Sequence, residues 1–213
     1  MVKRLFYVSL VLLLSFAASL AWGEGIELSL FLGMKDGSEN SDGVTVIFAI
    51  EDGGNVTEVF NQNWKEQKWS DMLTADLTNW GGKTIKLKLA TDPGEARNTG
   101  WDWILIGDAK VSAKGTLVYD IGQAVADKKA SLSVIFDGDN QETAGLLNGA
   151  NCDLDPGPVG GESKPKSFMQ HVPWDGKVGN TISRYEMTLP AVDTTAVDGI
   201  GKLTSTWGHV KAN

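Results

Sequence analysis

Tryptophans placed between polar and turn-forming residues are the first candidates for chemistry in this sequence. A flat indole ring stacks on the C–H face of a sugar, and neighbouring polar groups bond the sugar hydroxyls. Trp174 lies in a short turn sequence, and Trp64 and Trp69 flank a polar run. The alternative roles are a structural plug for Trp174 and an ordinary solvated loop around 97–98. The residues expected to bind carbohydrate are Trp174, His171, Trp64, Trp69, Arg97 and Asn98.

Two further tryptophans, Trp101 and Trp103, are separated by one residue in a segment that we expect to be a strand, 101–106. Side chains two positions apart in a strand point to the same face of the sheet. We therefore expect both rings to pack in the core instead of binding a ligand.

Oxygen-bearing side chains recur in the segment 36–43, which ends in a glycine. A calcium ion takes about six to eight oxygen ligands, and Asp36, Asn40 and Asp42 would supply three of them. The segment is not an EF-hand, because Ile47 stands where that motif needs a glutamate. Both a structural calcium site and a hydrated turn without metal remain open.

Catalytic motifs are absent from the sequence. The two histidines, His171 and His209, are far apart, and neither a nucleophile elbow nor a zinc-protease motif occurs. Carboxylates such as Asp92 and Asp102 would suit a glycosidase, but an acidic chain contains many such pairs by accident. A small sandwich also lacks the deep cleft that raises a carboxyl pKa. We therefore expect a protein that is not an enzyme.

The N-terminus has the pattern of a secretory signal peptide. Lys3 and Arg4 precede an apolar run, 5–20, that is too short for a comfortable membrane span. We expect cleavage after Gly23, which removes residues 1–23. The mature chain would then be secreted, periplasmic or held in the cell envelope, without inserting into a membrane.

Charge and cysteine content restrict the partners. The formal net charge of −8 becomes −10 once Lys3 and Arg4 are removed with the signal peptide. Nucleic acid and anionic membrane surfaces are therefore poor partners. Cys152 is the single cysteine, so no internal disulfide forms. An inert thiol and a dimer linked through Cys152 are the two alternatives for it.

Short runs of alternating apolar and polar residues recur between clusters of Gly, Asp, Asn and Pro, as an antiparallel β sandwich requires. The long connection 137–166 is either a functional loop or a mobile one. One helical turn is expected at 123–129. The expected strands are 26–32, 44–50, 56–60, 71–77, 84–90, 101–106, 116–121, 131–136, 167–171 and 183–189.

Several spaced motifs between residues 28 and 111 resemble the novel carbohydrate-binding module family that accompanies secreted glycoside hydrolases. The resemblance implies a galactose-binding-domain-like jelly roll, and the structural calcium that proteins of this fold often hold. The motifs are Gly33–Ser38, Ser41–Thr45, Trp64–Trp69, Asp76–Leu77 before Gly82–Thr84, Thr91–Gly94 and Asn98–Trp103.

A second stretch, Phe168–Gly176 with Gly179–Thr181 and Tyr185–Pro190, is similar to the half that normally comes first in such modules. Here the order is reversed. Either the chain is circularly permuted and both halves close one sandwich, or it carries two incomplete modules. We favour a permuted single domain over 24–190, because half a sandwich would expose sheet edges. The tail 191–213 is then expected to be partly disordered.

The function expected from these features is non-catalytic recognition of a polysaccharide or glycan through aromatic residues on loops. One alternative is a structural or protein-interaction module of the cell envelope with the same fold. A small glycoside hydrolase is the third and least favoured alternative, since it needs two carboxylates converging in a cleft.

Overall fold

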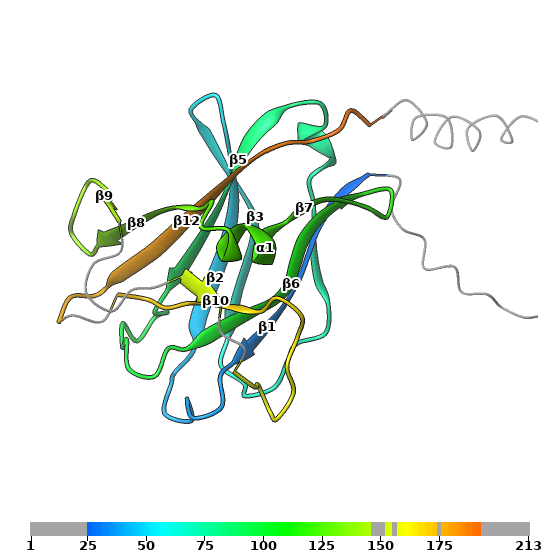
Figure 1. Cartoon of the computed structure of the whole chain (residues 1–213). Coiled ribbons are helices and arrows are strands. Elements are labelled where there is room, and N and C mark those ends of the chain that lie inside the picture. Colours follow the sequence, from blue (N-terminus) through cyan, green and yellow to red (C-terminus); the bar gives the residue numbers. More distant parts are fainter. Residues whose placement is uncertain (1–24, 146–151, 155–156, 174–175, 193–213) are drawn as a thin grey trace, which may run out of the picture.

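Leucines that alternate in the sequence line one face of the first strand. The computed structural model describes residues 25–145, 152–154, 157–173 and 176–192, and the structural statements below concern these residues. In β1 (Ile26–Met34), Leu28, Leu30 and Leu32 are fully buried in the main hydrophobic core. Two antiparallel sheets enclose this core face to face (Figure 1). The fold is therefore an all-β sandwich.

The first sheet, called sheet A, has six strands in the order β10–β11–β6–β1–β4, with β7 also paired to β6. A register shift between β1 and β6 coincides with Asp108, whose φ is 46°. On the side of β6 away from β1, β11 pairs near Ile106 and β7 pairs from Lys110 onward. The new strands are β4 (Leu73–Asp76), β6 (Ile104–Ala113), β7 (Thr116–Asp120), β10 (Cys152–Leu154) and β11 (Phe168–Gln170).

The second sheet, sheet B, has the order β3–β2–β5–β12–β8–β9. Gly53 and Gly54 form the tight turn between β2 and β3, and both have positive φ, 56° and 89°. Two-residue hairpins favour this conformation, which glycine adopts without steric cost. The strands are β2 (Val44–Asp52), β3 (Asn55–Trp64), β5 (Thr84–Asp92), β8 (Ser131–Phe136), β9 (Thr143–Ala144) and β12 (Gly179–Thr188).

Most predicted strands are confirmed within a few residues. The helical turn predicted at 123–129 is α1 (Ile121–Ala126), which begins after Asp120 caps the amide of Gln123. A short 3-10 helix, η1 (Thr78–Trp80), precedes β5. The strand predicted at 101–106 is wrong at its start, because β6 begins at Ile104. In the described part of the chain, no helix has the length and apolar character needed to cross a membrane.

Two strands near the C-terminal end of the described chain pair with earlier strands, one in each sheet. β11 pairs with β6 in sheet A, and β12 lies between β5 and β8 in sheet B. A buried amide joins the sheets, since Gln170 Nε2 donates to the carbonyl oxygens of Leu89 (3.2 Å) and Thr181 (3.1 Å). Ser183 Oγ donates to Gln170 Oε1 at 2.6 Å. Residues 26–113 and 168–188 thus share one core.

Candidate functional site

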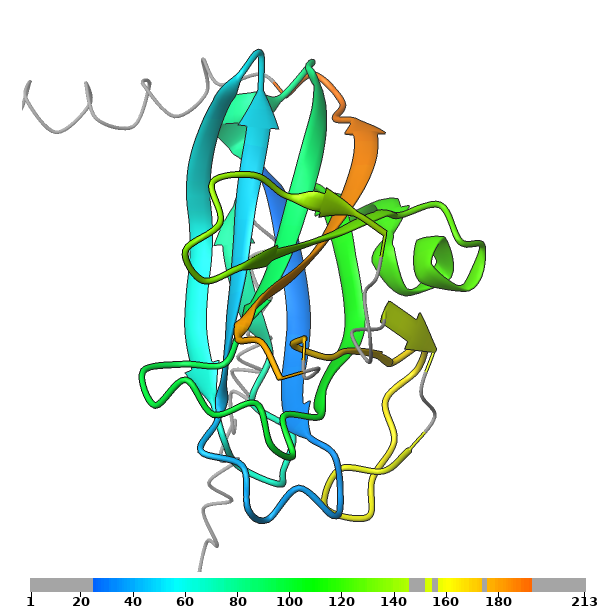
Figure 2. The same cartoon turned by 90° about the vertical axis from the view of Figure 1, so that its left-hand side faces the viewer.

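Two loops lie side by side at one end of the sandwich, at the bottom of Figures 1 and 2. Residues 35–43 join β1 to β2, and residues 93–103, called the platform loop, join β5 to β6. The amide of Lys35 donates to the carbonyl oxygen of Trp103 at 2.9 Å. A Cβ built on Gly37 would lie 3.7 Å from the Trp103 ring. The platform loop is therefore held against its neighbour by backbone and ring contacts.

Trp101 and Trp103 form an aromatic pair on the platform loop. Their ring centroids are 5.2 Å apart and their planes are tilted by 59°. Trp101 is 46% exposed, whereas Trp103 is half-buried. The prediction that both rings pack in the core is wrong for Trp101, because residues 101 and 103 precede β6 and so do not share a strand face.

The backbone of Trp101 has an unusual conformation, with a φ of 67°. This left-handed region is sterically unfavourable for a bulky side chain, and such strain costs about 1–3 kcal/mol. The amide of Trp103 donates to the carbonyl oxygen of Trp101 at 2.8 Å, which closes a tight turn. Trp101 thus combines backbone strain with an exposed indole ring. Strained residues concentrate at functional sites.

Asp102 lies between the two tryptophans and points the other way, with no exposed surface. Ser41 Oγ donates to Asp102 Oδ1 at 2.7 Å, while Oδ2 has no hydrogen-bond partner among the described residues. Burial raises the pKa of Asp102 to about 7, the Ser41 hydrogen bond opposes this shift, and the charge of Asp42 adds to it. Asp102 is therefore far less acidic than an exposed aspartate.

Two predicted site residues, Arg97 and Asn98, belong to the same platform loop. Arg97 donates to Asp92 through Nη1 at 2.7 Å, and to Asp137 through both Nε and Nη2. Its guanidinium thus ties the loop to β5 and to the start of the β8–β9 hairpin. Asn98 is exposed, and its Oδ1 accepts from the amide of Gly100 at 3.0 Å. Of these two, Asn98 offers the side chain more accessible to a ligand.

Trp64 and Trp69 are half-buried and have internal partners for their indole N–H groups. Trp64 Nε1 donates to the carbonyl oxygens of Glu66 (2.9 Å) and Lys68 (3.2 Å). Trp69 Nε1 donates to the carbonyl oxygen of Glu162 at 3.1 Å. A Cβ on Gly33 or Gly107 would lie 3.0 Å from the Trp69 ring, so the ring packs directly over both glycines. Trp69 thus covers β1 and β6.

The remaining two residues expected to bind carbohydrate are Trp174 and His171. Trp174 falls outside the described residues. His171 is buried, with 6% of its surface exposed, and a ring nitrogen bonds the carbonyl oxygen of Val172. Burial lowers the pKa of this histidine. His171 therefore presents little surface to a ligand.

The predicted calcium ligands do not form a ready oxygen cage. Both carboxylate oxygens of Asp36 accept from backbone amides, those of Gly160 at 2.6 Å and Gly161 at 3.1 Å. Asn40 and Asp42 are exposed. Within the ranges described, no three residues among His, Cys, Asp and Glu are grouped closely enough to hold a metal ion. Asp36 therefore fastens the segment 157–162 to the loop 35–43, and the calcium site stays a prediction.

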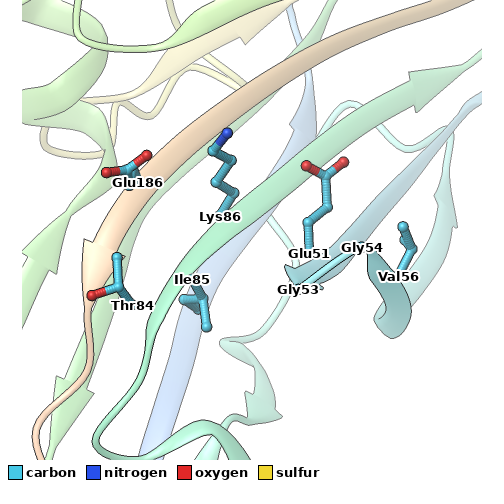
Figure 3. Close-up of a pocket in the computed structure, with 8 residues that line it drawn as sticks. All are labelled: Glu51, Gly53, Gly54, Val56, Thr84, Ile85, Lys86 and Glu186. Carbon is cyan, nitrogen blue, oxygen red and sulfur yellow. The ribbon is translucent and has the colours of Figure 1, made fainter.

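The outer face of sheet B carries a hollow of about 350 Å³ beside the β2–β3 turn (Figure 3). Lys86 is paired across the strands with Glu51 on one side and Glu186 on the other. Arg184 binds Glu51 through Nε (2.9 Å) and Glu142 through both terminal nitrogens. The single positive charge of Arg184 is thus neutralised within the protein.

A second hollow on the same face, of about 330 Å³, has an apolar floor of Ile47, Ala90 and Ile182. The β8–β9 hairpin lies across this face (Figure 2), and Glu142 from the hairpin lines the hollow. The floor contains no aromatic ring. The platform loop therefore has a feature for sugar stacking that this hollow lacks.

Comparison with known proteins gives no further guidance: no family model, no curated protein and no solved structure matches the chain. Of the surfaces described, the end that carries Trp101 and Trp103 combines an exposed aromatic ring, backbone strain and accessible polar groups.

Proposed function

We propose that this protein is an exported, non-catalytic carbohydrate-binding module with a galactose-binding-domain-like jelly roll. It holds a polysaccharide or glycan on the aromatic pair formed by Trp101 and Trp103. The observation that carries the proposal is the exposed, left-handed Trp101 with the Trp103 ring 5.2 Å away. Strained residues cluster at functional sites, and an exposed indole offers a ligand a large apolar face.

The aromatic pair fits the chemistry of a sugar ring. One face of a pyranose is lined with C–H groups, which pack on the exposed indole of Trp101. Trp103 is tilted by 59° beside it, so the two rings make an angled surface instead of a flat one. Asn98 and Asp42 are exposed on the two adjoining loops and supply hydrogen-bonding groups for hydroxyls. This surface is shallow, which suits binding to a chain without cleaving it.

The proposed binding is tested by measuring retention on insoluble polysaccharides and binding to a glycan array. Trp101→Ala should weaken the binding of the retained glycan by about tenfold, because one aromatic contact is worth about 1.4 kcal/mol. The melting temperature should change little, since the ring is exposed. The matched control is Leu117→Ala, which removes an equally exposed apolar side chain from β7. Equal retention by the wild type and Trp101→Ala proteins would reject the site.

A protein-binding role in the cell envelope is the second candidate, and strand β3 favours it. This edge strand of sheet B has 10 residues and contains neither lysine nor proline, the residues that commonly block strand addition. Apart from its pairing with β2, its backbone amides and carbonyls form no backbone hydrogen bond with another described segment. An extended peptide would add to such an edge. This candidate predicts that no glycan on the array is retained.

A further inference from the structure

We infer that Asp102 is the positioning residue of the aromatic pair: its buried side chain, bonded to Ser41, fixes the turn that presents Trp101 next to Trp103. This inference rests on the proposed function, because it concerns the same binding surface. It goes further by assigning a role to a residue that touches no ligand. Asp102 has no exposed surface, so it acts only through its neighbours in the chain.

The side chain of Asp102 connects two loops that are far apart in the sequence. Ser41 Oγ donates to Asp102 Oδ1 at 2.7 Å across 61 residues of sequence. The same Ser41 oxygen accepts from the amide of Gly43 at 3.0 Å, which orders the turn leading into β2. Ser41 is thus fixed from one side by its own loop. Asp102 is in turn fixed by Ser41, and Trp101 and Trp103 are its immediate neighbours in the chain.

Packing in the core alone does not explain why position 102 is an aspartate. One of its carboxylate oxygens, Oδ2, is buried without a hydrogen-bond partner among the described residues. An unsatisfied buried polar atom opposes folding, and an apolar residue of similar size would avoid that cost. What an apolar residue cannot provide is the bond to Ser41. The geometry therefore points to the Ser41 bond as the reason for a polar side chain here.

The inference is testable without a ligand, because two indoles at this distance couple electronically. The aromatic pair should give a paired positive and negative band in the far-ultraviolet circular dichroism spectrum. Trp101→Phe removes one partner and assigns the band to the pair. Ser41→Ala removes the donor to Asp102 together with the acceptor of the Gly43 amide, whereas Asp102→Ala removes only the acceptor of the Ser41 hydroxyl. Both variants should lose at least about half of the coupled band while the β-sheet signal stays.

Rescue by a conservative change separates positioning from general stability. Asp102→Asn keeps an oxygen that accepts from Ser41, and it should retain the coupled band and the wild-type affinity. Ser41→Ala and Asp102→Ala should bind the retained polysaccharide about fivefold more weakly or worse, by the same factor as each other. If Asp102→Ala does not fold, Ser41→Ala decides the question alone.

The outcomes are distinct for the inference and for the proposed function. A wild-type band and wild-type affinity in the folded Ser41→Ala protein would overturn the positioning role. Loss of the band in Ser41→Ala, together with no retention of any glycan by the wild type, would support the positioning role and reject carbohydrate binding.

Discussion

Arg184 on β12 donates two parallel hydrogen bonds to Glu142 of the β8–β9 hairpin, Nη1 to Oε2 at 2.8 Å and Nη2 to Oε1 at 2.7 Å. This paired geometry is the strongest form of a charge-assisted hydrogen bond. Ser133 Oγ adds a further bond to Glu142 at 2.8 Å. The hairpin is therefore held on the outer face of sheet B by a carboxylate that must stay ionised.

Acid should weaken this contact. The hydrogen bonds from Arg184 lower the pKa of Glu142 to about 2, from its usual 4.5. A lowered folded-state pKa stabilises the protein above pH 4.5, and this contribution is lost as the pH falls toward 2. At pH 7, Glu142→Gln should cost about 1 kcal/mol of unfolding free energy, and the difference from wild type should shrink below pH 4. Denaturant titrations of the wild type and Glu142→Gln at pH 7 and at pH 3 measure the two differences in unfolding free energy.

A surface carboxylate paired with a lysine serves as the control for Glu142. The carboxylate of Asp52 bonds Lys83 at 2.6 Å at the surface, so Asp52→Asn should cost about 0.5 kcal/mol or less. A Glu142→Gln penalty that persists unchanged at pH 3 would contradict the ion-pair explanation.

Gly107 should not tolerate a methyl group. A Cβ at this position would lie 2.7 Å from Lys164 Cβ and 3.0 Å from the Trp69 ring. Overpacking of this kind typically costs about 1–3 kcal/mol, so Gly107→Ala should lower the free energy of unfolding by that amount. Urea unfolding of Gly107→Ala beside the surface variant Leu117→Ala provides the measurement. If the two variants are equally stable, Trp69 does not pack on β6 as described.

The thiol of Cys152 should be unreactive in the folded protein. It is 8% exposed, it lies 3.8 Å from the hydroxyl oxygen of Tyr185, and burial raises its pKa to about 12. Only the thiolate reacts with disulfide reagents, and at pH 8 almost none is present. Labelling with Ellman's reagent should therefore be about 100-fold slower in buffer than in denaturant. Fast labelling, or a dimer on a non-reducing gel of the folded protein, would contradict this.

Removal of divalent cations should leave the fold unchanged. Both oxygens of Asp36 already accept from the amides of Gly160 and Gly161, so these hydrogen bonds hold the two segments together without a metal. A metal that binds only the folded state raises the melting temperature by mass action. The melting temperatures with EDTA and with calcium should therefore agree within about 1 °C. A clearly higher melting temperature with calcium would support Asp36, Asn40 and Asp42 as calcium ligands.

Strand positions followed from the sequence because period-two alternation reports which side chains are buried. In 84–92, for example, Ile85, Leu87 and Leu89 alternate with lysines, and β5 has this pattern of burial. The short strands β9 and β10 were not predicted, since two or three residues are too few to show a period. Their positions depend on pairing with β8 and β11, which is a property of tertiary structure.

The sequence around the aromatic pair is misleading for a related reason. The pattern at 101–103 alternates large apolar and polar residues, which is also how a strand reads. The backbone of Trp101 is left-handed instead, which no residue type at that position signals. Asn98 and Gly100 are turn-forming residue types, and the Gly100 amide donates to Asn98 Oδ1 at 3.0 Å in the loop before β6.

The position of β12 in sheet B determines when during synthesis this sheet can be completed. β12 is the last described strand in the sequence, yet it fills the gap between β5 and β8. Until residue 188 has been synthesised, the three N-terminal strands of sheet B and its β8–β9 hairpin have no common neighbour. Sheet B therefore becomes one continuous sheet only after residue 188 has been made, so this late strand, and not the N-terminal strands, completes the sandwich.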